Sequence, residues 1–342
     1  EYALTNNLSL ESGYVGSESR HLPVVAGENE SAALVAPGVN VNPYRPFPDF
    51  GSSSFISQSS SATYNSLQTT IKRRAANGLT FIGTHTWSHS LDDAREPFPA
   101  TGEGGYRSYP ILGRRIEYSN SPFDVRHRVT LTASYELPFG TGRRFLNQHG
   151  WVNGIVGGWT GTVVWTAQAG SPFTVRANTV TANGAAGGCC NSGAFPTLIG
   201  DPYAGGGAPN ATNPSQICPT VVGNAQHFYN ACAFADPPLG SLILPGQVLT
   251  GAAAAAFLPS ARSQIHGPGY DRFNASLYKD FKVSERQSLQ FRADIFNVAN
   301  HPSLGLPNTT LGNNAGQITT SRGFGSNTPD ARFFQLALKY YF

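Results

Sequence analysis

Polar and apolar residues alternate with a period of two along much of this 342-residue chain. Between positions 128 and 137, one set of alternate residues is apolar or aromatic: Val129, Leu131, Ala133, Tyr135 and Leu137. The set between them is polar: Arg128, Thr130, Thr132, Ser134 and Glu136. Similar alternation recurs at 159–168, 288–295 and 332–342. Because successive side chains of a strand point to opposite faces, the pattern predicts amphipathic β-strands rather than helices.

The alternation predicts eight strands, at residues 4–15, 63–74, 79–90, 127–138, 154–170, 271–281, 287–298 and 331–342. Short connections at 75–78, 139–153 and 282–286 alternate with long ones at 16–62, 91–126, 171–270 and 299–330. Strands of about ten to twelve residues that are joined by alternately short and long connections are typical of outer-membrane barrels. We therefore predict an all-β fold, an antiparallel transmembrane β-barrel segment spanning residues 1–342, with the long loops extracellular.

The polar face of the predicted strands supports this fold. It carries charged or amide side chains: Glu11, Gln68, Lys72, Arg128, Glu136, Gln168, Asp280, Arg292 and Asp294. In the dry core of a soluble barrel an unpaired ion would cost several kcal/mol, whereas a wet lumen removes that cost. Aromatic residues near the strand ends fit interfacial girdles: Tyr14, Trp87, Tyr135, Phe139, Trp159, Trp165, Tyr278, Phe281 and Tyr340. The alternative is a soluble β-protein, in which aromatic residues simply favour strands.

Composition excludes two other classes of protein. No stretch approaches the ~18 consecutive apolar residues of a transmembrane helix. The net charge of +3 is small and dispersed, whereas a protein that binds nucleic acid shows a clustered basic face. The chain starts at Glu1 and contains no Met, so we interpret it as a processed product or a fragment.

Several segments resemble known outer-membrane proteins. The last eight residues, Gln335 to Phe342, resemble the C-terminal signal of bacterial outer-membrane barrels, with Leu336, Leu338, Tyr340 and Phe342 as its alternating residues. Other segments resemble the C-terminal part of Oar-like TonB-dependent transporters, whose full chains carry a carboxypeptidase-regulatory-like domain. These segments are 64–68 (YNSLQ), 78–81 (GLTF), 86–93 (TWSHSLDD), 123–129 (FDVRHRV), 135–140 (YELPFG), 267–269 (GPG) and 291–302 (FRADIFNVANHP).

The resemblance implies a larger protein with 22 strands and an N-terminal plug, the plug being absent from these residues. It also implies partners: outer-membrane lipid, the barrel-insertion machinery, the TonB system and an unknown nutrient ligand. Loop aromatic and arginine residues are then candidates for ligand binding: Tyr44, Arg45, Phe47, Tyr106 and Arg107. A closed eight-stranded barrel is also allowed, but its interior would need larger side chains than the Ser, Thr and Gly found here. Two further alternatives are an adhesive or structural surface protein and a fragment that assembles with other copies through its strand edges.

Four cysteines fall in the connection 171–270: Cys189, Cys190, Cys218 and Cys232. In an oxidising exterior we expect disulfides, with each of the two adjacent cysteines paired to Cys218 or Cys232 in an unknown order. The alternative, a zinc site, lacks a C-x-x-C pair. His85 and His89 would lie about 13 Å apart on one strand, too far to share an ion, and are interpreted as a polar cluster in the lumen or at a loop base. No catalytic motif is present, so we predict neither enzymatic activity nor a cofactor.

Overall fold

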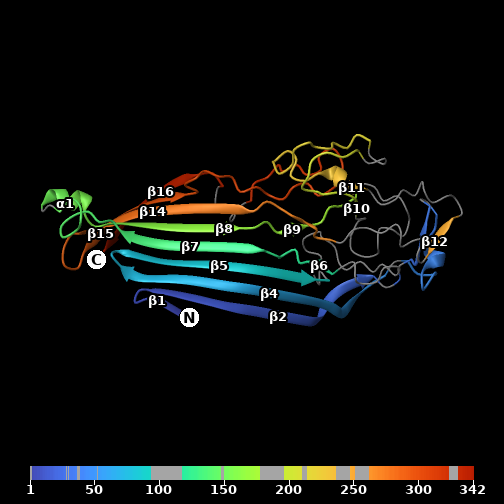
Figure 1. Cartoon of the computed structure of the whole chain (residues 1–342), viewed down its shortest axis with the longest axis horizontal. Helices are drawn as coiled ribbons and strands as arrows, with labels where there is room; N and C mark the ends of the chain where they lie inside the picture. Colours follow the sequence, from blue (N-terminus) through green and yellow to red (C-terminus); the bar gives the residue numbers. More distant parts are fainter. Residues whose placement is uncertain are drawn as a thin grey trace.

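The computed structural model describes residues 2–27, 29, 31–36, 39–51, 53–93, 118–147, 150–177, 196–209, 214–235, 247–250, 262–322 and 330–342. Its main feature is one antiparallel sheet, in which each long strand pairs with the next along the chain (Figure 1). The long strands are β2 (Leu8–Gly27), β4 (Ser54–Ala76), β5 (Leu79–Asp92), β7 (His127–Glu136), β8 (Trp159–Gln168), β14 (Tyr270–Lys282), β15 (Ser288–Phe296) and β16 (Phe333–Tyr341). Two short strands complete the sheet, β1 (Tyr2–Thr5) beside β2 and β6 (Ser119–Asn120) beside β5. The eight predicted strands are therefore confirmed as an antiparallel all-β fold.

The pairing register carries the alternation across the whole sheet. Residues that face each other in adjacent strands share a face, and Gln68, Thr86, Arg128 and Gln168 follow one another in this way. All nine charged or amide residues predicted for the polar side lie on this face, called the polar face below. The opposite face, called the apolar face, carries paired residues such as Phe291 and Leu338.

The aromatic residues are divided less cleanly than expected. Trp159 and Phe281 lie on the apolar face, since Trp159 pairs with Lys279 and Phe281 pairs with Leu289. Tyr278 instead pairs with Thr160 and Arg292, which places it on the polar face. Its assignment to an interfacial girdle is therefore wrong. Even-numbered residues of β14 point to the polar face, whereas Phe281 and the other odd-numbered residues point to the apolar face.

Two strands are much longer than predicted. β2 has 20 residues and β4 has 23, which correspond to about 66 and 76 Å at ~3.3 Å per residue. The hydrocarbon core of a bilayer is only ~30 Å thick, so this hairpin extends well past it. Residues 16–27 and 54–62, expected in a loop, are strand. The first predicted strand is also divided, because β1 and β2 meet at a turn over Asn6 and Asn7.

The fifth predicted strand begins later than expected. Residues Trp151–Val156 form the short helix α1, and β8 starts only at Trp159. Gly157 and Gly158 separate the two elements, and Gly158 has a φ of 75°, a conformation that glycine adopts without strain. The two glycines therefore let the chain turn sharply from the helix into the sheet.

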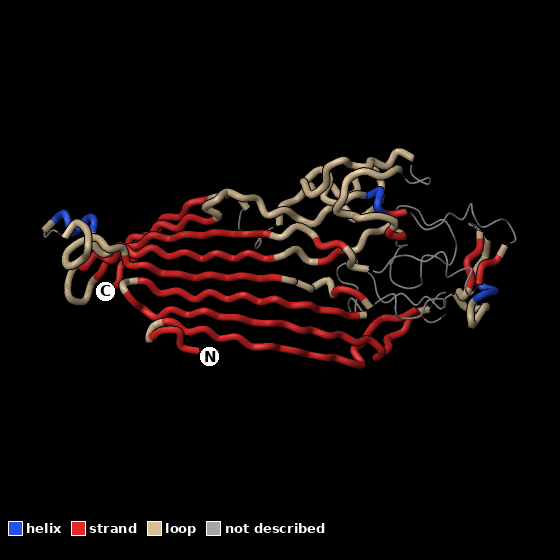
Figure 2. The backbone as a smooth tube through the Cα atoms, viewed as in Figure 1, coloured by secondary structure: helices blue, strands red, loops and turns tan. Residues whose placement is uncertain are grey.

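The ends of the sheet differ in structure. Four short connections, the β1–β2 turn among them, join the described strands at one end, called the turn end, whereas the long connections lie at the other, called the loop end (Figure 2). At the loop end, β9 (Pro172–Phe173) pairs with β13 (Ile265–His266), and β10 (Thr197–Leu198) pairs with β11 (Phe234–Ala235), which follows the 3-10 turn Ala231–Ala233. Beyond them, β3 (Ala33–Val35) pairs with β12 (Val248–Thr250), near the 3-10 turn Asn42–Tyr44.

The long connections share a hydrophobic core, which the sequence analysis did not expect. Nine buried residues from four separate segments pack together: Phe173, Val175, Tyr229, Ala231, Ala233, Phe234, Ile265, Leu311 and Ala315. These segments form what we call the lobe, residues 171–177, 196–235, 262–267 and 303–322 as far as they are described. The lobe is thus held by packing as well as by its disulfide.

Candidate functional site

A buried asparagine organises the outermost described loop. Asn29 is 2% exposed, and its Nδ2 donates to the carbonyl oxygens of Phe47 (2.8 Å), Phe50 (3.1 Å) and Gly51 (2.9 Å). Its Oδ1 accepts from the backbone nitrogen of Phe47 at 2.8 Å. One side chain therefore fixes residues 47–51 into a single path, which leaves the rings of Phe47 and Phe50 62% and 67% exposed.

The predicted ligand-binding residues take different positions in this loop. Phe47 is exposed, as a ligand contact would need to be. Arg45 turns inward, because its Nε donates to Asn42 Oδ1 at 2.9 Å and its Nη1 donates to the carbonyl oxygen of Asn29. Tyr44 ends the 3-10 turn and is half-buried. Tyr106 and Arg107 lie outside the described residues.

Buried charges join the lobe to the sheet. Arg262 is fully buried, and its Nη2 forms an ion pair with the carboxylate of Asp92 at the end of β5. The backbone carbonyl of Arg262 accepts from Ser119 Oγ at 2.5 Å, and that of Ser263 accepts from Asn120 Nδ2 at 3.1 Å. A buried ion is tolerated only when it is paired, so this cluster holds the lobe in a defined position over the strands.

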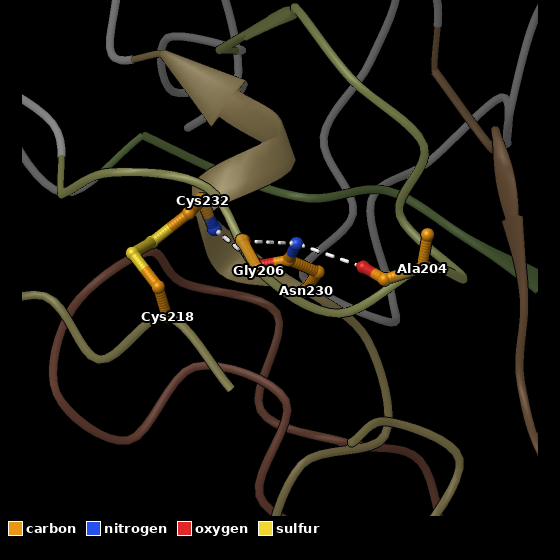
Figure 3. Close-up of a disulfide and its surroundings, with 5 residues drawn as sticks. All are labelled: Ala204, Gly206, Cys218, Asn230 and Cys232. Atoms are coloured by element: carbon orange, nitrogen blue, oxygen red, sulfur yellow. Dashed lines mark hydrogen bonds between the residues drawn. A yellow bond between two sulfur atoms is a disulfide. The ribbon is translucent and has the colours of Figure 1, made fainter. Parts of the chain in front are cut away.

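The disulfide of the lobe corrects the expected pairing. Cys218 bonds to Cys232, with their Cα atoms 5.4 Å apart, whereas each had been expected to pair with Cys189 or Cys190. Asn230 positions Cys232, because its Oδ1 accepts from the backbone nitrogen of Cys232 at 2.9 Å (Figure 3). The Nδ2 of Asn230 donates to the carbonyls of Ala204 and Gly206, both at 2.8 Å. This local turn brings the two cysteines together, and Cys189 and Cys190 lie outside the described residues.

A recess of about 500 Å³ opens beside the disulfide. It is lined mainly by small residues and backbone, including Gly205, Gly206 and Gly207, with Asp201 as its acidic side chain. Asp201 Oδ1 already accepts from the backbone nitrogen of Tyr203 at 2.8 Å. Such a lining can offer backbone hydrogen bonds and shape to a polar ligand, but it lacks the paired titratable groups that acid–base chemistry requires.

Tyr229 lies in the hydrophobic core of the lobe. It is fully buried, and its hydroxyl donates to the carbonyl of Asn308 at 3.1 Å. Burial raises the pKa of Tyr229 above its usual value, so the phenol stays neutral and acts as a structural donor. The described part of the chain contains no group of three His, Cys, Asp or Glu side chains that could hold a metal ion.

The histidines lie on the apolar face, not in the lumen. His85 Nε2 lies 3.3 Å from His127 Nδ1, and the ring of His127 also stacks on Trp87. His89 contacts Asn120 at 3.1 Å and Arg126 at 2.8 Å. The interpretation as a loop-base polar cluster therefore holds for His89, whereas His85 belongs to an aromatic group at the loop end of the apolar face.

A second recess, of about 580 Å³, lies at the turn end. Polar-face residues of three strands line it, among them Lys72, Thr80 and Ser134, together with the β1–β2 turn. The Lys72 ammonium lies 3.4 Å from the carboxylate of Glu11 on the same face. The alternation predicted Glu11, Lys72 and Ser134 on the polar face but did not indicate the recess, because the recess depends on the β1–β2 turn.

Three residues that hold the loop-end segments together were not predicted from the sequence. Asn29, Asn230 and Arg262 lie in connections without alternation, and an isolated Asn or Arg carries no signal of burial. The segment around Asn29 combines Asn with Gly and Ser, which indicates a turn but not which side chain supports it.

Solved structures align with nearly the whole chain at low sequence identity. A search of curated proteins found no match. Among solved structures, the outer membrane transporter YddB from Escherichia coli aligns with a TM-score of 0.43 and 9% identity, over 99% of this chain and 31% of that one. The ferric-catecholate import receptor Fiu from Escherichia coli K12 aligns with a TM-score of 0.34 and 11% identity, over 100% of this chain and 34% of that one. This chain thus spans about a third of either structure.

The family comparison covers nearly the whole sequence. Residues 1–335 match the profile of a family described as outer membrane beta barrel domain. The match spans every long strand of the sheet except the last six residues of β16. The chain belongs to the outer membrane beta barrel domain family.

Proposed function

We propose that this chain forms part of the wall and the external loops of a TonB-dependent outer-membrane transporter of the Oar-like type. The observation that carries the proposal is the division of the sheet into two faces by its register. The nine predicted ions and amides, from six strands, share the polar face, while aliphatic and aromatic residues predominate on the other. In a bilayer, this division suits a wet lumen on one side and lipid on the other.

The two ends of the sheet support a direction for the chain in the membrane. Outer-membrane barrels have short turns on the periplasmic side and longer loops outside. By this rule the lobe and the loop that Asn29 organises (residues 29–51, called the Asn29 loop) face the exterior and would capture ligand. The recess near Lys72 then lies toward the periplasm. A plug and the TonB system, both implied by resemblance, would then gate and drive the uptake of a scarce or bulky nutrient.

The direction can be tested by labelling whole cells that express the native protein. Phe50→Cys places a thiol at the exposed tip of the Asn29 loop, and Glu285→Cys places one in the turn between β14 and β15. A membrane-impermeant maleimide should label Phe50→Cys on intact cells, but label Glu285→Cys only after the outer membrane is permeabilised. The reverse pattern would contradict the proposed direction.

Transport itself requires a ligand and an energy source. The purified protein is screened by thermal unfolding against ferric chelates, oligosaccharides and peptides, because a ligand that binds the folded state raises Tm. A compound that raises Tm should enter wild-type cells and not cells that lack TonB. Uptake that is independent of TonB would contradict the proposed mechanism.

A second function is favoured by the edges of the sheet. Among the described residues, β16 pairs with β15 alone, and β2 beyond Leu10 pairs with β4 alone. Backbone groups at such edges need partners in a bilayer, and another copy could supply them. A self-assembling surface protein would then show copies crosslinked between β2 and β16 in native membranes, whereas a transporter barrel would show no intermolecular crosslink there.

A further inference from the structure

The helix α1 is attached to the apolar face of the sheet. Trp159 Nε1 donates to the carbonyl oxygen of Ile155 at 2.8 Å, and Lys279 Nζ donates to that of Gly154 at 2.5 Å. Trp159 and Lys279 face each other in adjacent strands on the apolar face. Because both side chains reach α1 from this face, the helix lies on the side of the sheet that faces lipid in a member of this family.

The outer surface of α1 is apolar and uncovered. Trp151 is 79% exposed and Ile155 is 60% exposed, and residues four apart lie on the same side of a helix. Val152, Asn153 and Val156 are half-buried on the other side. The preceding turn adds Phe145 and Leu146, 48% and 52% exposed. Large apolar side chains exposed on one side of a helix mark an interaction surface.

Charge identifies the partner that suits this surface. Residues 137–158 contain Arg143 and Arg144 but no Asp or Glu. Arg143 is held by the polar-face carboxylate of Glu136 at 2.7 Å, so the cation left at this surface is Arg144, whose guanidinium lies 5.4 Å from the centre of the Phe145 ring. Basic residues beside exposed Trp, Phe and Leu are typical of segments that lie in the headgroup layer of anionic lipid.

Lys279 also fits a position at the membrane boundary. Its ammonium lies 4.9 Å from the centre of the Phe281 ring and 5.8 Å from that of Trp159. A lysine on a lipid-facing surface directs its charge toward the boundary while its alkyl chain stays among apolar groups. The bond to Gly154 therefore places the carbonyl end of α1 at the depth where the apolar face meets the headgroups.

We propose that α1 and the turn 139–150 form an interfacial anchor, which lies in the headgroup layer at the turn end of the sheet and binds anionic phospholipid. Trp151 and Ile155 insert below the headgroups, and Arg144 remains among the phosphates. The anchor would fix the depth of the sheet in the membrane. It requires the lipid-facing role of the apolar face, but not transport and not the direction of the loops.

Spin labelling of the native protein in nanodiscs of phosphatidylethanolamine and phosphatidylglycerol tests this proposal. A nitroxide at Ile155→Cys should collide several-fold more often with oxygen, relative to a water-soluble nickel complex, than one at Glu285→Cys. Glu285 is the matched control, since it is exposed in another turn at the same end. Equal collision ratios at the two positions would overturn the proposal.

A second measurement uses the native side chain, in case the label disturbs the helix. Brominated lipids should quench the fluorescence of the wild-type protein more than that of Trp151→Phe, and the difference spectrum gives the contribution of Trp151. An unquenched difference spectrum would overturn the insertion of Trp151.

Replacing phosphatidylglycerol by phosphatidylcholine should reduce the quenching, and an unchanged value would overturn the assignment of anionic lipid. The whole-cell labelling above has a separate readout, so failure of one proposal is distinguishable from failure of the other.

Discussion

Asn29 holds the outer loop through four side-chain hydrogen bonds, although it was not among the residues predicted from the sequence. In Asn29→Ala, the carbonyls of Phe50 and Gly51 and the amide of Phe47 lose this partner, while the Phe47 carbonyl keeps its bond from the Phe50 nitrogen. The change should destabilise the loop by about 2–3 kcal/mol. Hydrogen exchange of the Phe47 amide should accelerate accordingly. Asn40→Ala is the control, because the exposed Asn40 accepts only from the Asn42 nitrogen, at 2.9 Å, among the described contacts. Equal acceleration in both variants would contradict this role.

At the residue scale, the sequence predicted the kind of side chain better than its direction. Arg45 and Phe47 were chosen because loop arginines and aromatics commonly bind ligands. Phe47 is exposed, but the guanidinium of Arg45 contacts Asn42 and Asn29. The direction of a loop side chain depends on distant partners such as Asn29, which no short-range pattern encodes. The same limit explains why the pairing of Cys218 with Cys232 was not predicted.

At the element scale, the disulfide should stabilise the lobe and leave the sheet unaffected. The two cysteines are 14 residues apart, and opening a loop of this size costs about 3 kcal/mol. The variant Cys218→Ser/Cys232→Ser should therefore make the lobe more sensitive to proteolysis. The difference in electrophoretic mobility between unheated and heated samples, which reports the folded sheet, should stay unchanged, because the lobe has its own buried core. Loss of the folded sheet in this variant would show that lobe and sheet unfold together.

Periodicity identified the strands because burial on one face imposes it. All eight long strands were predicted, and β5 and β7 begin at the expected residues. The extensions of β2 and β4 were missed, since past the bilayer both faces meet water and the constraint disappears. Only the second half of α1, residues 154–156, was assigned to a strand, because it directly precedes the alternating segment 159–168. The lobe was missed because its core residues come from separated segments without any period.

The whole molecule depends on which face of the sheet meets lipid, and two neighbouring residues of β8 can decide this. Val163 lies on the apolar face between Ala133 and Ala275, whereas Thr162 lies on the polar face between Ser134 and Ser276. Arginine on the lipid face near the bilayer midplane costs about 2–4 kcal/mol. Val163→Arg should therefore lower the free energy of unfolding by about that amount in urea titrations of the protein folded into vesicles. Thr162→Arg adds the same charge at the same depth, but into a polar lumen, and should cost less than about 1 kcal/mol. The reverse order would exchange the two faces, and with them the positions of lumen, lipid and anchor.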